Sequence, residues 1–198
     1  MKNKWKISFF VLLGIVALTL GVLFFMITAP ADDMAYRQGQ LDEKKESVKL
    51  QVKTNKSDMN KVLNHYLEEE SKAGSIDYRV ALGEEVELYG TMPLFSENVN
   101  MKMTFEPKAL KNGDLVLRQK NISVGSLNLP VSYVLKMVMN NYNLPEFVYI
   151  QPNEEMVYIS LQKLKLKGDV KVRADRFDLQ KDNISFTLQV PAKTEFKR

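Results

Sequence analysis

The feature that most constrains this chain is a run of 21 uncharged, mostly apolar residues from Ile7 to Ile27. At about 1.5 Å per residue, a helix of that length measures about 30 Å, which matches the hydrocarbon core of a bilayer. Lysines precede the run at positions 2, 4 and 6, and aspartates follow it at positions 32 and 33. The positive-inside rule keeps such lysines in the cytoplasm. We therefore expect residues 1–29 to form a cytoplasmic tip and a single transmembrane anchor, with the C-terminal domain extracellular.

A cleaved signal peptide is the alternative interpretation of this segment. Ala29-Pro30-Ala31 resembles a small-residue cleavage site placed just after the apolar run. The apolar region of a signal peptide extends to about 15 residues, however, and the run here is longer. Its length favours a retained anchor, whereas a mature chain that begins at Asp32 would demonstrate cleavage.

The charge balance argues against nucleic acid as a partner. The chain has 28 basic and 24 acidic residues, a formal net charge of +4. Three of the bases are the lysines before the apolar run, so the remainder carries 25 bases against 24 acids. A nearly neutral domain lacks the electrostatic footprint of a nucleic-acid-binding protein. The chain also has no cysteine, which excludes disulfides, thiol catalysis and cysteine-ligated metals.

Beyond the apolar run, the chain divides into a linker and one domain. Residues 30–47 are polar with little apolar periodicity, which indicates a linker. Residues 48–198 suit a single domain of ordinary size. At its start, Val48, Leu50 and Val52 alternate with polar residues, which predicts a half-buried strand.

Two amphipathic helices are expected within the domain. The first has Ser57 as its N-cap and ends before Gly74. Its apolar stripe consists of Met59, Val62, Leu63, Tyr66 and Leu67. The second begins at Pro130 and ends before Pro145. Its apolar stripe consists of Val131, Val134, Leu135, Val138, Met139 and Tyr142.

Alternating apolar runs elsewhere predict antiparallel strands. A three-residue loop at 83–85 keeps the apolar side continuous between the first two runs, and Asn112-Gly113 marks a later turn. After the second helix, strands are expected at 147–150, 156–161, 164–166, 170–174 and 184–190. A change of parity near residues 162–163 suggests a β-bulge. The following hairpin would pair Leu166 with Val170.

These patterns predict an α+β fold in which a curved, mainly antiparallel β-sheet wraps the two helices. The second helix is apolar over more than half its circumference and needs cover by a curved sheet, a ligand or a membrane surface. Methionines among the apolar positions adapt to ligands of variable shape, although core filling is the commoner reason for them. We expect a lipid cavity to be lined by Met101, Met103, Phe105, Val134, Leu135, Val138, Met139, Tyr142 and Tyr158.

A row of basic residues accompanies the expected C-terminal hairpin. The inferred register places Lys165 opposite Lys171 and Lys163 opposite Arg173, and like charges facing each other are unfavourable. Either neighbouring acids offset this repulsion, or the row binds an anionic partner such as phospholipid headgroups or teichoic acid. The second interpretation predicts an anionic-headgroup site at Lys163, Lys165, Lys171 and Arg173.

No recognisable catalytic apparatus is present. The chain has no G-x-S-x-G, Walker, Rossmann or kinase motif. Its one histidine, His65, falls on the polar side of the first helix. The acid clusters 68–70, 84–85 and 154–155 have no metal-ligand spacing, and adjacent acids are usually solvated. We therefore expect a non-enzymatic protein without a metal or cofactor.

Several segments carry a family resemblance: IDYRVALGEEVELYGTMPLF, LNLPVSYVLKMVMNNY and PNEEMVYISLQKL, together with the lysine-flanked apolar run. With them, nearly the whole chain resembles the YpmS family of Bacillus and related Gram-positive bacteria, a resemblance that implies a membrane-anchored protein but no known activity. The order of elements is also similar to the tubular lipid-binding superfamily, in which curved sheet encloses an acyl-chain cavity. A similarity of element order does not establish function.

Two functional hypotheses lead, and a hydrolase is kept as a third although few groups could serve as acid, base or nucleophile. The first is a protein of the Gram-positive cell envelope, held at the membrane, that binds or transfers a lipid or lipid-linked polymer. The second is a non-catalytic scaffold or accessory subunit of an envelope enzyme such as a lipase, with a filled core. Lipid that co-purifies with the domain would favour the first, and a ligand-free domain that captures a partner would favour the second.

Overall fold

The computed structural model describes residues 3–28, 47–71, 78–94, 97–125, 129–142, 144–164 and 166–192. The chain forms two compact units, Met1–Asp32 and Asp33–Arg198. The first contains helix α1, Asn3–Thr28. Within the described residues, no helix combines the length and the apolar character that a membrane crossing requires. The anchor therefore stays a prediction, and the expected linker, apart from its last residue, lies outside the described residues.

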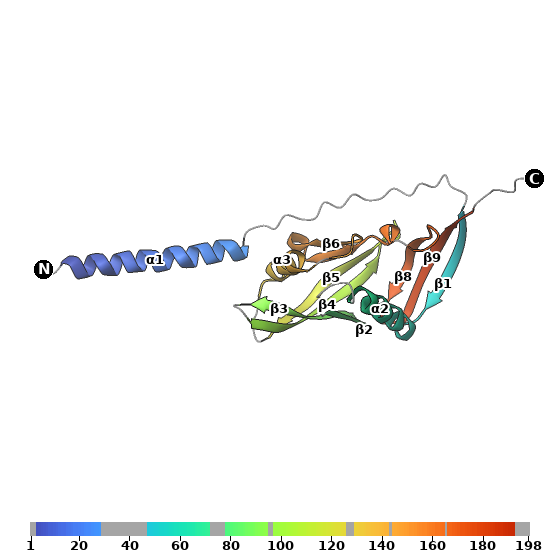
Figure 1. Ribbon diagram of the computed structural model, residues 1–198, viewed down its shortest axis with the longest axis horizontal. Coiled ribbons are helices and arrows are strands. Elements are labelled where there is room, and N and C mark those ends of the chain that lie inside the picture. Colours follow the sequence, from blue (N-terminus) through green and yellow to red (C-terminus); the bar gives the residue numbers. More distant parts are fainter. Residues whose placement is uncertain are drawn as a thin grey trace, which may run out of the picture. The chain divides into compact units, whose positions relative to one another are not determined.

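The second unit is an α+β structure with two antiparallel sheets (Figure 1). The small sheet has the order β1-β9-β8, from β1 (Ser47–Thr54), β9 (Asn183–Pro191) and β8 (Lys171–Asp178). The large sheet has the order β2-β3-β4-β5-β7-β6, from β2 (Tyr78–Leu82), β3 (Val86–Leu94), β4 (Glu97–Ala109), β5 (Leu115–Val124), β7 (Met156–Ile159) and β6 (Val148–Gln151). The expected α+β class is confirmed, but the strands divide between two sheets.

The first hairpin forms as the sequence predicts. β2 and β3 pair Val80 with Leu88 and Leu82 with Val86, and three residues connect them. Because an odd loop preserves parity, the apolar residues of both strands share one face. In the next strand pair, β4 shifts its register against β5 at Thr104 and Phe105.

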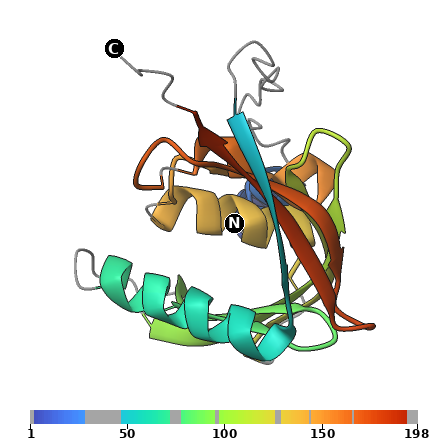
Figure 2. The ribbon, with the colours of Figure 1, turned by 90° about the vertical axis from the view of Figure 1, so that its right-hand side faces the viewer.

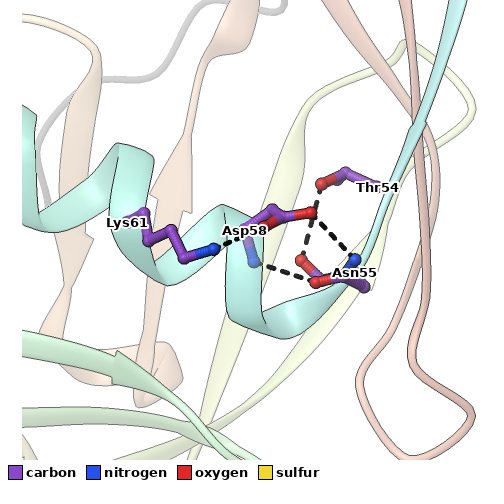
Figure 3. Close-up of polar contacts among 4 residues, drawn as sticks. All are labelled: Thr54, Asn55, Asp58 and Lys61. Carbon is purple, nitrogen blue, oxygen red and sulfur yellow. Dashed lines mark hydrogen bonds and ion pairs between the residues drawn. The ribbon is translucent and has the colours of Figure 1, made fainter.

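Helix α2, Lys56–Ser71, has a different N-cap from the one expected. The Asp58 backbone N–H donates to Asn55 Oδ1 at 2.8 Å, and Asn55 Nδ2 donates to Asp58 Oδ2 at 3.0 Å (Figure 3). Asn55 is thus the cap, in a reciprocal arrangement with the third helical residue. The assignment of Ser57 was wrong, because Ser57 already lies in the first turn.

Helix α3, Val131–Asn141, supplies the centre of the hydrophobic core. Its first position is Val131, with Pro130 at the N-cap rather than inside the helix. Viewed along the unit, strands of both sheets curve around α3 (Figure 2). Val134 and Leu135 are fully buried and join the same cluster as residues of β4, β5, β8 and β9. Full burial of a leucine or valine side chain stabilises a fold by about 1.5–3 kcal/mol.

Three expectations for the C-terminal third were wrong: the bulge, the strand at 164–166 and the hairpin after it. Leu161–Lys163 forms a 3₁₀ helix, and neither Leu164 nor Leu166, the two described residues of the expected strand at 164–166, is in a strand. The sequence showed a change in the alternation of apolar residues here, which indicated a β-bulge. The 3₁₀ turn is the actual cause of that change. The hairpin between Leu166 and Val170 is consequently absent, and β8 instead pairs with β9.

Candidate functional site

Most residues of the predicted lipid cavity are packed inside the protein's own core. Seven of the nine are buried: Met101, Met103, Phe105, Val134, Leu135, Val138 and Tyr158. Met139 and Tyr142 are half-buried and pack against the same cluster. The fold places eight of these residues in or against one hydrophobic cluster, which does not include Tyr158, and their contacts are with other protein side chains. Their role in holding a ligand stays a prediction.

Tyr158 belongs to a buried polar network rather than to an apolar wall. Its hydroxyl donates to the Asp114 carboxylate, which is completely buried, and accepts from Asn112 Nδ2 at 2.8 Å. The Gln162 backbone N–H lies 3.4 Å from Asp114 Oδ1, and Gln162 Nε2 donates to the Asn112 carbonyl at 3.0 Å. The network ties the β4–β5 turn to β7 and to the 3₁₀ turn after it. Buried polar groups need such partners, so this network has a structural role.

A second polar cluster lies on the outer face of the large sheet. Tyr89 donates its hydroxyl hydrogen to Glu87 at 2.6 Å, and Lys102 Nζ donates to Glu87 at 3.0 Å. The hydrogen bond from Tyr89, followed by that from Lys102, lowers the pKa of Glu87 below its usual 4.5. Arg79 covers the Tyr89 ring at 4.9 Å from its centroid. All these charges already have partners.

A hollow of about 360 Å³ lies beside this cluster. Its lining comes from β3, β4 and the end of β5: Tyr89, Gly90, Asn100, Met101, Lys102, Ser123 and Gly125. It shares one residue, Met101, with the predicted lipid cavity. Of its seven lining residues only Met101 has an aliphatic side chain, and the hollow is partly open to solvent.

The apolar row of β1 is exposed, although the sequence predicted a half-buried strand. Val48, Leu50 and Val52 are 54%, 49% and 40% exposed. They lie beside Val190, Leu188 and Phe186 of β9 respectively. We call the first five of these residues, Val48, Leu50, Val52, Leu188 and Val190, the apolar strip. The row is exposed because, within the described part of the chain, no other layer covers the apolar side of β1, which is the edge strand of the small sheet.

The apolar strip is continuous with the hydrophobic core. Leu188 packs against the core cluster, as do Met59 and Leu63 of α2. One helical turn from Met59, Val62 is 61% exposed, whereas the sequence placed it in a buried stripe. Contiguous exposed apolar side chains on a folded protein commonly mark a binding surface. This surface consists of the edge of the core, where the protein leaves apolar side chains uncovered.

The predicted basic row does not form as one row. Lys165 lies outside the described residues. Lys163 Nζ contacts the Tyr149 hydroxyl and lies 4.8 Å from the centroid of its ring. On β8, Lys171 pairs with Gln189 and Arg173 pairs with Thr187. The expected opposition of Lys163 and Arg173 was wrong, because no hairpin connects them.

His65 is exposed on α2, as its position on the polar side predicted. Among the described residues, no group of three or more histidine, aspartate or glutamate side chains is arranged to hold a metal ion. The polar clusters near Asp114 and Glu87 escaped the sequence analysis, because each depends on side chains from different strands. The short Asn112-Gly113-Asp114 sequence signalled a turn but not the burial of its carboxylate.

Fold and surface together define a class of protein: an α+β domain of two antiparallel sheets, preceded in the chain by an apolar helix, with an uncovered apolar strip at one sheet edge. The chain belongs to the bacterial family described as "Uncharacterized protein conserved in bacteria (DUF2140)", which matches residues 3–190. It is 31% identical over 190 residues to "Uncharacterized protein YpmS" of Bacillus subtilis (strain 168), covering 96% of this chain and 98% of that protein. No solved structure matches the chain. The expected family is confirmed, and the similarity to tubular lipid-binding proteins stays a prediction.

Proposed function

We propose that this protein is a non-enzymatic protein of the cell envelope, held at the membrane by α1, that binds a lipid or lipid-linked polymer through the apolar strip. The observation that carries the proposal is the exposure of Val48, Leu50 and Val52 beside a continuous core. An acyl chain laid on this strip would remove apolar surface from water, worth about 25 cal/mol per Å². The proposed ligand-binding surface is thus the exposed apolar strip at the edge of the core, not the cavity inside the core that the sequence predicted.

The membrane tether is supported by the sequence and extent of α1. The helix spans 26 residues, and 21 consecutive residues within it, 7–27, are uncharged. Large apolar side chains along it, including Phe10, Leu18 and Phe24, are exposed. The family match begins at residue 3, so it includes this helix. Lysines before the run favour a cytoplasmic N-terminus and an extracellular domain.

Photo-crosslinking tests the lipid contact. The full chain, in mild detergent with a diazirine-bearing phospholipid, is irradiated, and the modified peptides are identified by mass spectrometry. We expect modification of β1 and β9 in addition to α1, and a several-fold reduction at β1 in Leu50→Gln. Leu166→Gln is the matched control, because Leu166 is also an exposed leucine but lies outside the strip. Modification confined to α1, or equal effects of the two variants, would contradict lipid binding by the strip.

The second candidate function is that of a scaffold or accessory subunit, and the edge position of β1 favours it. In the described part of the chain β1 pairs with β9 alone, so its other side can accept a strand from a partner protein. A partner strand would protect the outward-facing amides of β1 from hydrogen exchange, which a lipid on the apolar face would not do. Comparing exchange in native membranes with exchange in the purified chain separates the two functions.

A further inference from the structure

The outer face of the small sheet carries a regular array of basic side chains. Along β8, Val172 and Ala174 point into the core, so Lys171 and Arg173 lie on the opposite face. The pairing register extends this face across all three strands, in which Lys49 and Lys171 flank Gln189, Gln51 and Arg173 flank Thr187, and Lys53 and Arg176 flank Ser185. We call its five cations the basic face: Lys49, Lys53, Lys171, Arg173 and Arg176.

The spacing of the basic face keeps its charges apart. Cations of β1 and β8 are separated by the uncharged side chains of β9, so they stand two strand spacings, or about 10 Å, from one another. Direct opposition of like charges, which destabilises a sheet, is thereby avoided. An additional residue in β8, at the register shift between Ala174 and Arg176, introduces Asp175. Its carboxylate accepts a hydrogen bond from Thr187 Oγ1 at 2.7 Å.

The cations of the basic face have no ion-pair partner among the described residues. Ion pairs in that part of the chain occur elsewhere, between Lys61 and Asp58 and between lysines and glutamates of the large sheet. Arg173 Nη2 donates to the Lys111 carbonyl at 3.1 Å, which neutralises no charge. The opposite face of the same strands is apolar, because Val172, Ala174 and Ile184 are buried there. The small sheet therefore separates an apolar face from a face that carries five cations together with the carboxylates of Asp175 and Asp178.

We propose that the basic face docks on the phosphate headgroups of an anionic bilayer surface. Charge complementarity favours such a partner, since each lysine or arginine near an anionic membrane adds about 1 kcal/mol of attraction, or about fivefold in the docking equilibrium. The serine and glutamine side chains between the cations can donate hydrogen bonds to phosphate oxygens, whereas Thr187 is buried and already donates to Asp175. This proposal rests on the tether of the proposed function but not on acyl-chain binding by the apolar strip.

The chain connecting α1 to β1 supports the bilayer as the occupant. Residues 29–46 join them, and an extended chain of this length reaches up to about 60 Å. The reach allows the domain to turn its basic face toward the bilayer to which α1 would hold it. Tethering converts docking into an intramolecular event, so a weak electrostatic contact suffices to populate the docked state.

Fluorescence energy transfer in nanodiscs tests the docking. The chain has no cysteine, so Gln51→Cys supplies one labelling site on the exposed part of the basic face without other changes. The labelled full chain is inserted into discs of phosphatidylcholine alone, or of phosphatidylcholine with phosphatidylglycerol, each with an acceptor on a headgroup. We expect higher transfer in the anionic discs and loss of the difference at high salt, because salt screens exposed charges. Equal transfer in both discs would overturn the proposal.

Charge-neutral variants locate the contact. Lys49→Gln with Lys171→Gln should lower the docking equilibrium constant by about 25-fold, at about fivefold per cation. The matched control is Lys108→Gln with Arg118→Gln, two exposed cations of the large sheet. An equal loss in both double variants would overturn the assignment to this face. If soluble polyphosphate changed the energy transfer but phosphatidylglycerol did not, the basic face would bind a free polyanion, and the proposal of bilayer docking would be overturned. Crosslinking of lipid to β1 is a separate measurement, so failure of either proposal is distinguishable from failure of the other.

Discussion

Asn60 of α2 and Leu82 of β2 exchange two hydrogen bonds. The Leu82 backbone N–H donates to Asn60 Oδ1 at 2.8 Å, and Asn60 Nδ2 donates to the Leu82 carbonyl at 3.0 Å. The amide side chain thus pairs with backbone groups at the edge of the large sheet, where the described part of the chain places no strand on that side of β2. Asn60 therefore attaches α2 to the sheet. It also provides hydrogen-bond partners for edge backbone groups that could otherwise pair with another chain.

Replacement of Asn60 by alanine should therefore destabilise the domain by about 2–3 kcal/mol, because two partly buried backbone groups lose their partners. Asn64→Ala, an exposed asparagine one helical turn further along α2, is the control and should change stability by less than about 0.5 kcal/mol. Urea unfolding of the full chain in mild detergent, followed by near-ultraviolet circular dichroism of the domain's tyrosines, measures both. Equal losses would show that the paired hydrogen bonds contribute little.

The N-cap of α2 provides a second comparison. Asn55→Ala should reduce the free energy of unfolding by about 1 kcal/mol, because the Asp58 backbone N–H loses its acceptor. Ser57→Ala should have a much smaller effect, since alanine is favourable inside a helix and the structure assigns no capping hydrogen bond to Ser57. The same urea titration decides between the two, and a larger loss for Ser57→Ala would restore Ser57 as the cap.

The pKa of Glu87 predicts a pH dependence of stability. Because its hydrogen bonds to Tyr89 and Lys102 lower the pKa in the folded state, ionised Glu87 stabilises the fold above its usual pKa of 4.5. This contribution is lost as the pH falls through the lowered folded-state pKa. Glu87→Gln should therefore be less stable than the natural chain near neutral pH, by under about 1 kcal/mol for a partly exposed pair. The difference should vanish in acid, and a difference independent of pH in unfolding titrations would contradict the assignment.

In this chain, the local periodicity of apolar residues predicts helices and strands better than it predicts whether another layer of the protein buries their apolar sides. The alternation of Val48, Leu50 and Val52 correctly indicates a strand, and pairing to β9 bears this out. Alternation cannot show whether another layer covers the apolar side, because that depends on residues far away in the sequence. The same limitation applies to the predicted cavity, because eight of its nine residues lie in or against the protein's own hydrophobic core and Tyr158 does not.

The sequence also cannot distinguish two structures that produce the same local pattern of residues. A β-bulge and a 3₁₀ turn both shift the alternation of apolar residues along a chain. The bulge predicted near residues 162–163 is therefore wrong, because the 3₁₀ helix Leu161–Lys163 produces the same shift. Asp114 lies in a sequence typical of an exposed turn, yet Tyr158 and Gln162, more than 40 positions later, make it a buried acceptor. The basic face depends on the register of three strands and was equally invisible before the pairing of β1 with β9 was known.

Two glycines separate the effect of backbone strain from that of close packing. Gly113 and Gly168 both have positive φ angles, +88° and +82°, so alanine at either position is strained by about 1–2 kcal/mol. A Cβ atom at Gly113 would lie 2.8 Å from Arg173 Cβ and Cγ, whereas one at Gly168 would have nothing within 4 Å. The Gly113 carbonyl also accepts the Ala174 N–H at 2.7 Å, which joins the β4–β5 turn to β8.

Gly113→Ala should consequently lose about 2–5 kcal/mol, the sum of strain and overpacking, against about 1–2 kcal/mol for Gly168→Ala. The excess should shrink when Arg173→Ala is combined with Gly113→Ala, because part of the crowded side chain is removed while its Cβ remains. Unfolding free energies of the three variants and of Arg173→Ala alone complete a double-mutant cycle. If the two glycine variants were equally destabilised and the cycle showed no coupling, close packing between the turn and β8 would have no energetic role.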